Sequence, residues 1–311
     1  MIYWNHLTIK ENNNMKKIHP WTLTGLIDAE GSLGVSIVKD TKRKSSYVIT
    51  LFLEIGLNVK DKTLLECIQT TLGVGNIYYK SSDNTYRWKV SNINQLSNVI
   101  IPHLTTYPLL TQKRADFELF VKIIEIIKRK EHISFNGLQE IVNLKASLNL
   151  GLTDSLRSSF PNTVAVSRPK VSFKGIPDPN WLTGFTEGEA CFFISIYKSL
   201  KTKLGLAVQL VFKITQHSRD VELLKGIEKF FACGRVEKRS TNACDFTVNS
   251  LKDFDNKIVP FFLKYPLHGS KFSNFKDFNK IIQIMKVKGH LKKEGLEIIQ
   301  NIKAGMNTGR K

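Results

Sequence analysis

Two short stretches of the chain decide its fold. Residues 23–31 read LTGLIDAEG and residues 182–190 read LTGFTEGEA, so one pattern returns 159 residues later. In each copy the pattern ends beside an acid, Glu30 or Glu189, and an alternating segment follows. A pattern this specific that occurs twice indicates an internal repeat, which has to be recognised before any other feature of the fold.

The repeat extends outward from these stretches in both directions along the chain. The same spacing pairs Asp61 with Asp220, and a spacing one residue shorter pairs Lys113 with Lys271 after two Tyr-Pro-Leu segments. We therefore predict a duplicated domain of roughly 130 residues per copy. The interpretation divides the chain into a disordered lead-in at 1–17, a first domain at 18–152, a proline-containing linker at 153–179 and a second domain at 180–311.

Periodicity predicts the same order of elements in each copy. A helix is followed by two strands, a second helix, two further strands and closing helices. The alternation of Leu33, Val35 and Ile37 with polar or small residues is typical of a half-buried strand. The fold class expected is therefore α+β, with two pseudo-symmetric αββαββα domains whose antiparallel sheets each have a polar face.

The opening helices carry the features expected of a shared interface. Gly25 and Ala29 lie four residues apart, as do Gly184 and Gly188, and small residues at this spacing let two helix backbones approach closely. Each helix then ends in an acid at the negative end of its macrodipole, which is unfavourable. Two such acids in proximity require a compensating cation, and a divalent metal held by carboxylate and carbonyl oxygens satisfies that requirement.

Composition favours a polyanionic partner. The 311 residues carry 46 Lys and Arg against 27 Asp and Glu, a formal net charge of +19. Such an excess indicates nucleic acid, with an anionic membrane surface as the alternative. No apolar run is long enough to span a bilayer. The four cysteines form no Cys-x-x-Cys pair, so we interpret them as reduced thiols rather than zinc ligands.

The polar strand faces are the predicted nucleic-acid surface. We expect the following residues to contact DNA: Ser32, Gly34, Ser36, Thr50, Glu54, Asn76, Tyr78, Lys80, Arg87, Lys89 and Ser91 in the first copy, and Cys191, Phe193, Ser195, Tyr197, Gln209, Lys213, Thr215, Arg235, Glu237, Arg239, Asp245, Thr247 and Asn249 in the second.

The twin motifs resemble those of single-chain LAGLIDADG homing endonucleases, especially the ones encoded in fungal mitochondrial introns. The resemblance implies a saddle of two sheets on double-stranded DNA, a monomer, and a mitochondrial location. It also implies double-strand cleavage of a long, non-palindromic site with 3′ overhangs. By the same resemblance Glu30 and Glu189 bind metal, together with Ala29 and Gly188. Lys113, Lys271 and Gln216 are the further catalytic candidates.

The expected cofactor is Mg²⁺, with Mn²⁺ able to replace it and Ca²⁺ supporting binding without efficient turnover. Two other functions remain open on the same fold: a maturase that binds intron RNA, and a DNA-binding regulator without catalysis. Retention of both acids argues against the regulator. Glu187, at the sixth motif position, is an alternative ligand, although helix phase favours Glu189. We interpret His132 and His290 as structural caps of the late helices.

Overall fold

The structure is a computed structural model that describes residues 17–43, 46–239 and 242–310. The predicted lead-in falls outside this part of the chain, apart from Lys17. The first half contains α1 (Pro20–Glu30), β1 (Gly31–Lys39), β2 (Tyr47–Asn58), η1 (Val59–Asp61), α2 (Lys62–Leu72), β3 (Asn76–Lys80), β4 (Thr85–Val90), α3 (Ile93–Gln95), η2 (Leu96–Ile100), α4 (Ile101–Thr106), α5 (Lys113–Lys128), η3 (Glu131–Ile133), α6 (Phe135–Ala146) and α7 (Asp154–Ser159).

The second half repeats this order. It contains α8 (Pro179–Glu189), β5 (Ala190–Lys198), β6 (Leu206–His217), η4 (Ser218–Asp220), α9 (Val221–Phe231), β7 (Arg235–Lys238), β8 (Ala243–Val248), α10 (Leu251–Asp253), η5 (Phe254–Ile258), α11 (Val259–Lys264), α12 (Lys271–Lys286), η6 (Gly289–Leu291), α13 (Lys293–Ala304) and η7 (Asn307–Gly309). The predicted α+β class and the repeated αββαββ order are confirmed.

Each half forms one four-stranded antiparallel sheet with its helices on one face. The strand orders are β1-β2-β4-β3 and β5-β6-β8-β7. In β2, Leu51, Leu53 and Ile55 are buried against helices, while the residues between them point to the opposite face. A separate apolar core lies under each sheet, and the second one is rich in phenylalanine.

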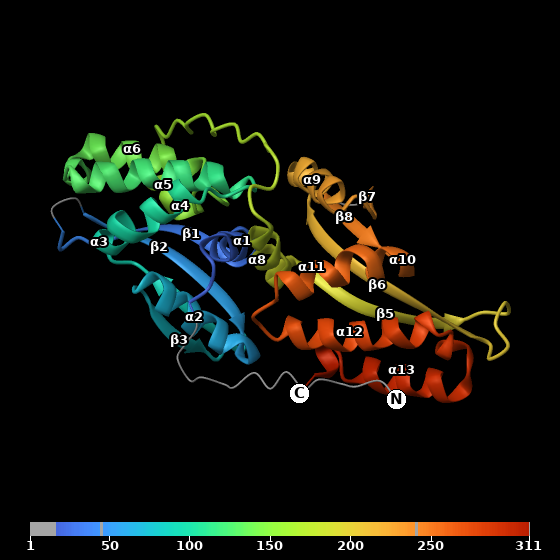
Figure 1. Ribbon diagram of the computed structural model, residues 1–311. Helices are drawn as coiled ribbons and strands as arrows, with labels where there is room; N and C mark the ends of the chain where they lie inside the picture. Colours follow the sequence, from blue (N-terminus) through green and yellow to red (C-terminus); the bar gives the residue numbers. More distant parts are fainter. Residues whose placement is uncertain (1–16, 44–45, 240–241, 311) are drawn as a thin grey trace.

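Helices α1 and α8 pack side by side at the centre of the molecule, with one sheet on each side (Figure 1). A Cβ atom added to Gly25 would lie 2.0 Å from the carbonyl oxygen of Trp181, and one added to Gly184 would lie 1.9 Å from that of Thr22. The predicted close approach is therefore real, and only glycine fits at these two positions. Both helices begin with a proline in the first turn, where its missing N–H costs nothing.

The segment between the halves is more ordered than linker composition suggests. It begins with α7, whose Leu156 joins a small core with Leu138 and Phe160. Further along, the Arg168 guanidinium donates to both carboxylate oxygens of Asp116, at 2.6 and 2.8 Å. These contacts hold the connection against α5, which the prediction of a plain linker did not include. Every helix in the described ranges is too short or too polar to cross a membrane.

The two histidines predicted to cap late helices occupy a different position. His132 and His290 lie in the 3-10 turns η3 and η6, each with a buried Nδ1 that has no hydrogen-bond partner. The cap of α6 is Ser134, whose hydroxyl accepts from the N–H of Gly137. The histidines therefore belong to the turns that precede the helices and do not cap them.

Candidate active site

The acid-ended helices bring Glu30 and Glu189 together at the pseudo-twofold axis. A Cβ atom added to Gly188 would lie 2.9 Å from Glu30 Oε1, which shows how closely the end of α1 approaches α8. Desolvation by the surrounding protein raises the pKa of both carboxyls above the ordinary glutamate value. The negative charge of Glu30 raises the pKa of Glu189 further. The site therefore disfavours two bare negative charges, as the helix argument predicts.

Each helix end is closed by a lysine from a later helix of its own half. Lys113 Nζ donates to the carbonyl oxygens of Ile27 at 3.0 Å, Asp28 at 2.8 Å and Ala29 at 3.4 Å. Lys271 Nζ donates in the same way to Thr186 at 2.9 Å, Gly188 at 3.1 Å and Ala190 at 2.5 Å.

Neither α1 nor α8 has a basic residue in its own last turn. The lysine ammonium groups therefore donate to the unpaired carbonyls of these helix ends and offset the negative end of each helix dipole. Burial lowers the pKa of both lysines, and the nearby acids oppose that effect. The lysines thus supply part of the positive charge that sequence reasoning had assigned to metal alone.

The sixth motif position has a structural task in both halves. Asp28 is buried, and its carboxylate accepts from Leu110 N at 2.8 Å, Thr111 N at 3.1 Å and Trp181 Nε1 at 2.8 Å. Glu187 accepts from the backbone N–H groups of His268 and Gly269. Both acids hold the turn that precedes the lysine-bearing helix. Two backbone N–H groups thus engage Glu187, which favours Glu189 as the predicted metal ligand of this half.

Gln216 is the point where the two halves of the site differ. It lies at the end of β6, and a hydrogen bond from its side chain to Glu189 opposes the rise in the pKa of that carboxyl. The matching residue at the end of β2 is Leu57, which is buried and has no polar side-chain atom. Only the second copy can therefore offer an amide beside its acid.

The donor set fits a hard divalent cation that also binds substrate. Neither Glu30 nor Glu189 forms an ion pair within the described ranges of the chain, and although Glu189 accepts from Gln216, the two carboxylates keep lone pairs that a cation could use. The same ranges contain no cluster of three or more His, Cys, Asp or Glu that could form a complete metal cage. Mg²⁺ commonly binds to one or two carboxylates and completes its shell with water and phosphate oxygens. The backbone carbonyls of Ala29 and Gly188, the other two predicted metal ligands, already accept from the lysines, and each carbonyl has a second lone pair.

The polar faces of the two sheets flank this centre. Register places Ser32, Glu54, Lys89 and Asn76 in one row across the first sheet, and Cys191, Lys213, Thr247 and Arg235 in the matching row of the second. Exposed positions on the first face include Ser32, Thr50, Tyr78 and Lys80. Both rows face away from the helices, so most of the predicted contact residues share one surface in each half.

Several predicted contact residues do not reach that surface directly. Gly34 is buried because the Phe52 ring lies over it, 2.0 Å from where a Cβ atom would stand. Asp245 and Thr247 are 4% and 8% exposed, so their side chains act mainly within the sheet. Ser91 and Asn249 are exposed but lie just beyond the ends of β4 and β8.

Sequence reasoning passed over one pair of residues near the lysines. Asp61 accepts from Ser270 N at 2.5 Å, and Asp220 accepts from Gln112 N at 2.8 Å, so each reaches into the opposite half. The two aspartates were visible as a matched pair in the repeat. Their matching position was the signal, but their partners depend on how the halves dock.

Known proteins share this architecture. The family model described as LAGLIDADG endonuclease matches residues 23–124 and 182–282. Two Neurospora crassa proteins, probable intron-encoded endonucleases 3 and 2, are 37% and 36% identical to the chain over 92% of its length. The chain spans 54% and 64% of the length of these two relatives.

Solved structures of DNA complexes are similar over almost the whole fold. The I-LtrWI LAGLIDADG homing endonuclease bound to target DNA is 51% identical, with a TM-score of 0.91 over 94% of this chain and 98% of that one. I-SmaMI bound to cleaved DNA is 40% identical, with a TM-score of 0.93 over 95% and 99% of the two chains. Because the family model spans both motif copies and both sheets, this chain belongs to the LAGLIDADG endonuclease family.

Proposed function

We propose that the chain is a homing endonuclease that makes a double-strand break in a long, non-palindromic DNA site. The observation that carries the proposal is the pair of acids at the meeting point of α1 and α8, between two polar sheet faces. The DNA bound in the I-LtrWI and I-SmaMI structures supports a DNA partner for this chain. The two faces differ in sequence, which favours an asymmetric site bound by one monomer.

The length of the strands suggests the length of the site. A strand of nine to twelve residues, such as β1 or β2, spans roughly 30–40 Å. Since DNA rises about 3.4 Å per base pair, each sheet covers about ten base pairs and the two together about twenty. Cleavage at the centre, where Glu30 and Glu189 meet, would leave 3′ overhangs, as the family resemblance implies.

Each group at the centre has a distinct proposed task. Glu30 and Glu189 would hold Mg²⁺. Lys113 and Lys271 fix the helix ends that carry these acids, and Gln216 orients Glu189. A bound Mg²⁺ would lower the pKa of a water molecule and stabilise the leaving oxygen. Mn²⁺ should replace it, whereas Ca²⁺ should support binding with little turnover. A structure of I-SmaMI with calcium and uncleaved DNA supports the last expectation.

A mitochondrial location follows from the family resemblance, and it is supported by fungal relatives that are described as intron-encoded endonucleases. The natural target would then be the uninterrupted form of the host gene. This places the cleavage site at the junction of the sequences that flank the coding intron.

A plasmid assay tests the proposed function. A supercoiled plasmid carrying the joined flanking sequences should become linear with Mg²⁺ and stay intact in excess EDTA. With Ca²⁺ it should be bound but not cut, and binding should weaken about 10³-fold between 50 and 200 mM salt if six or so phosphates are contacted. Undiminished cutting in EDTA would exclude the metal-dependent mechanism. Tight binding without any cutting in Mg²⁺ would favour a regulator or a maturase.

A further inference from the structure

Asp61 and Asp220 stand where an aspartate ordinarily caps its own helix. Asp61 is the N-cap residue of α2 and Asp220 that of α9, and neither side chain makes the capping hydrogen bond. Side-chain caps hold the turns η1 and η4 that lead to them: Asn58 Oδ1 accepts from Lys60 N, and His217 Nδ1 accepts from Arg219 N. Both aspartates are therefore presented in a fixed position while their own helices go without a side-chain cap.

The two carboxylates instead reach helices of the opposite half. Asp61 Oδ1 accepts from Ser270 N at 2.5 Å, and Asp61 Oδ2 accepts from Ser270 Oγ at 3.0 Å. Asp220 Oδ1 accepts from Gln112 N at 2.8 Å. Ser270 and Gln112 are the N-cap residues of α12 and α5, and neither supplies a side-chain cap of its own. The aspartates thus place negative charge at the positive ends of these two helices.

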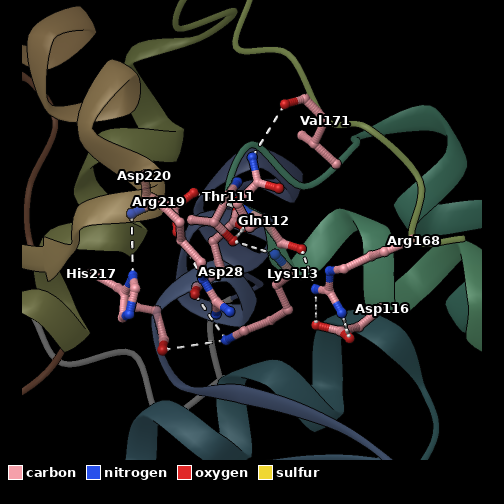
Figure 2. Close-up of polar contacts among 11 residues, drawn as sticks. Asp28, Thr111, Gln112, Lys113, Asp116, Arg168, Val171, His217, Arg219 and Asp220 are labelled. Carbon is pink, nitrogen blue, oxygen red and sulfur yellow. Dashed lines mark hydrogen bonds and ion pairs between the residues drawn. The ribbon is translucent and has the colours of Figure 1, made fainter. Parts of the chain in front are cut away.

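The residue that follows each of these N-caps is the active-site lysine. Lys271 opens α12 and Lys113 opens α5, so the start of each helix sets where the lysine side chain begins. Figure 2 shows Asp220 from the second half beside Gln112 and Lys113 of the first, with Asp28 of α1 beside the same turn. The turn is therefore held from two sides, by Asp28 within its own half and by Asp220 across the interface.

The second half has the same arrangement around a glycine. A Cβ atom added to Gly269 would lie 2.7 Å from Asp61 Oδ1 and 2.9 Å from Glu187 Oε2. The two acids therefore enclose the turn before Lys271 closely enough to exclude any side chain. Such enclosure by one acid from each half fixes the backbone in a way that one domain alone could not.

We propose that Asp61 and Asp220 are positioning residues that act across the interface, each setting the active-site lysine of the opposite half. Asp220 positions Lys113, and Asp61 positions Lys271. Their helices forgo an ordinary cap to provide this contact, and the contact occurs twice at matched positions. A consequence is that neither half can assemble its lysine correctly until the two halves have docked. The proposal rests on the proposed function only because DNA cleavage is one of its readouts.

Double-mutant cycles test the assignment of each aspartate to one lysine. Asp220→Ala should slow cleavage by about ten- to a hundredfold through misplacement of Lys113. In a protein that already carries Lys113→Met, the same change should slow cleavage no further. Combined with Lys271→Met it should multiply the loss, because that lysine is set by Asp61. Asp61→Ala should give the mirror pattern, and Asp220→Asn should retain most activity because its amide oxygen still accepts from Gln112.

A second readout does not depend on cleavage. Lys113 is half-buried in the wild type and its Nζ donates to backbone carbonyls, so a lysine-acylating reagent followed by mass spectrometry should label it slowly. Asp220→Ala should speed the labelling of Lys113 and leave Lys271 unchanged, and Asp61→Ala should do the reverse. Thermal melts would identify variants that fail to fold, and Asp220→Ser and Asp61→Ser, whose shorter uncharged side chains reach less far across the interface, would then replace them in the comparison.

The outcomes separate the two proposals. If the wild type does not cut any target but the labelling follows the crossed pattern, the positioning proposal stands and the proposed function fails. If the wild type cuts and the losses multiply in every combination, the aspartates act as general stabilisers and the positioning proposal is overturned. Labelling that rises equally at both lysines would also overturn it.

Discussion

In the first sheet a carboxylate on β2 pairs with a guanidinium on β4, whereas at the same place in the second sheet an ammonium on β6 pairs with a carboxylate on β8. Glu54 and Arg87 are 2.5 Å apart, and Lys213 and Asp245 are 2.9 Å apart. The two pairs occupy equivalent positions. Lys213 follows Glu54 by 159 residues, just as Thr215 follows Gly56. Arg87 lies opposite Gly56 in the first sheet, and Asp245 lies opposite Thr215 in the second. The duplicated fold thus keeps the ion pair and exchanges its charges.

Each pair belongs to a larger cluster on its sheet. Glu54 also accepts from Tyr78 at 2.7 Å and lies 3.5 Å from Lys89. Asp245 accepts from Thr215 at 2.7 Å and pairs with Arg239 at 2.9 Å. One acid, half-buried in the first sheet and buried in the second, therefore organises several basic or polar groups in each half, and the groups presented outward differ between the halves.

The helix interface allows no such exchange. Gly25 and Gly184 face carbonyl oxygens at distances that no side chain can tolerate, and both copies keep glycine. Coulomb attraction is the same when two charges change places, but a steric contact with a backbone is not. The comparison suggests that the axis fixes how the halves dock, while the sheets are free to differ in what they contact.

The largest effect is expected from substitutions in the catalytic centre that the two halves share. Glu30→Gln and Glu189→Gln should each reduce double-strand cleavage on the order of 10³-fold, because Gln keeps the shape and loses the charge that binds metal. DNA binding should remain. Cleavage assays and band shifts on the same target measure both effects, and normal cleavage by either variant would remove that acid from the site.

Stability provides the control for these two variants. Burial raises the folded-state pKa of both carboxyls above the unfolded value, so the charged forms cost stability, and the cost appears as pH rises through the folded-state pKa. Since Gln removes that cost, both variants should melt no lower than the wild type at pH 7. A lower melting temperature would mean that lost cleavage reflects unfolding.

The next effect concerns the interface. Gly25→Ala and Gly184→Ala force a methyl group against a backbone carbonyl and should cost about 3 kcal/mol or more in the free energy of unfolding. Gly188→Ala meets side-chain atoms instead, Ala29 Cβ at 2.5 Å and Glu30 Cγ at 2.8 Å. It should cost about 1 kcal/mol and reduce cleavage more than stability, because Glu30 must move. Urea unfolding and cleavage rates compare the three variants, and equal stability losses would contradict this ranking.

A smaller effect tests the exchanged charges directly. Glu54→Lys alone places a third cation beside Arg87 and Lys89 and should cost about 1 kcal/mol, whereas Glu54→Lys with Arg87→Asp restores an ion pair of the kind in the second sheet and should recover most of it. Burial alone would raise the pKa of Glu54, but hydrogen bonds from Tyr78 and Arg87 bring it below the ordinary 4.5. The stabilisation by Glu54 is therefore present above pH 4.5 and lost as pH falls through its lowered value.

Urea unfolding at pH 7 and pH 3 measures this contribution. The difference in stability between wild type and Glu54→Gln should shrink at the lower pH. A double variant no more stable than Glu54→Lys would show that the pairs are not equivalent.

Much of this architecture can be predicted from the sequence, because the repeat and the strand alternation are local signals. The position of the repeated motif is enough to predict that Glu30 and Glu189 end the paired helices and that Gly25 and Gly184 lie in the contact between them. The contact between Asp220 and Gln112 cannot be predicted in this way, because it depends on the docked position of two domains. The burial of Gly34 was missed for a similar reason, since it depends on where the Phe52 ring turns within the sheet.

The helix ends show a subtler limit of sequence reasoning. The macrodipole argument correctly required positive charge near Glu30 and Glu189. It assigned that charge to metal, although Lys113 and Lys271 supply part of it. Both lysines were identified as candidates, but nothing in their spacing from the motif shows that they bind carbonyls at the helix ends. Only the three-dimensional packing of α5 and α12 reveals that role.

The smallest effect is expected at the ends of α2 and α9, where different residues adopt the same left-handed backbone conformation. Both helices end at a left-handed residue, Gly73 with φ +70° in the first half and Ala232 with φ +49° in the second. Glycine adopts this region freely, whereas alanine does so at a cost that exceeds the extra chain entropy of glycine. Ala232→Gly should therefore stabilise the protein by about 0.5–1 kcal/mol, and Gly73→Ala should destabilise it by a similar amount. No atom lies within 4 Å of a Cβ added to Gly73, so backbone strain alone determines the stability that Gly73→Ala loses. Urea unfolding of both variants measures the pair, and a loss of stability in Ala232→Gly would show that contacts of the Ala232 methyl group outweigh the strain.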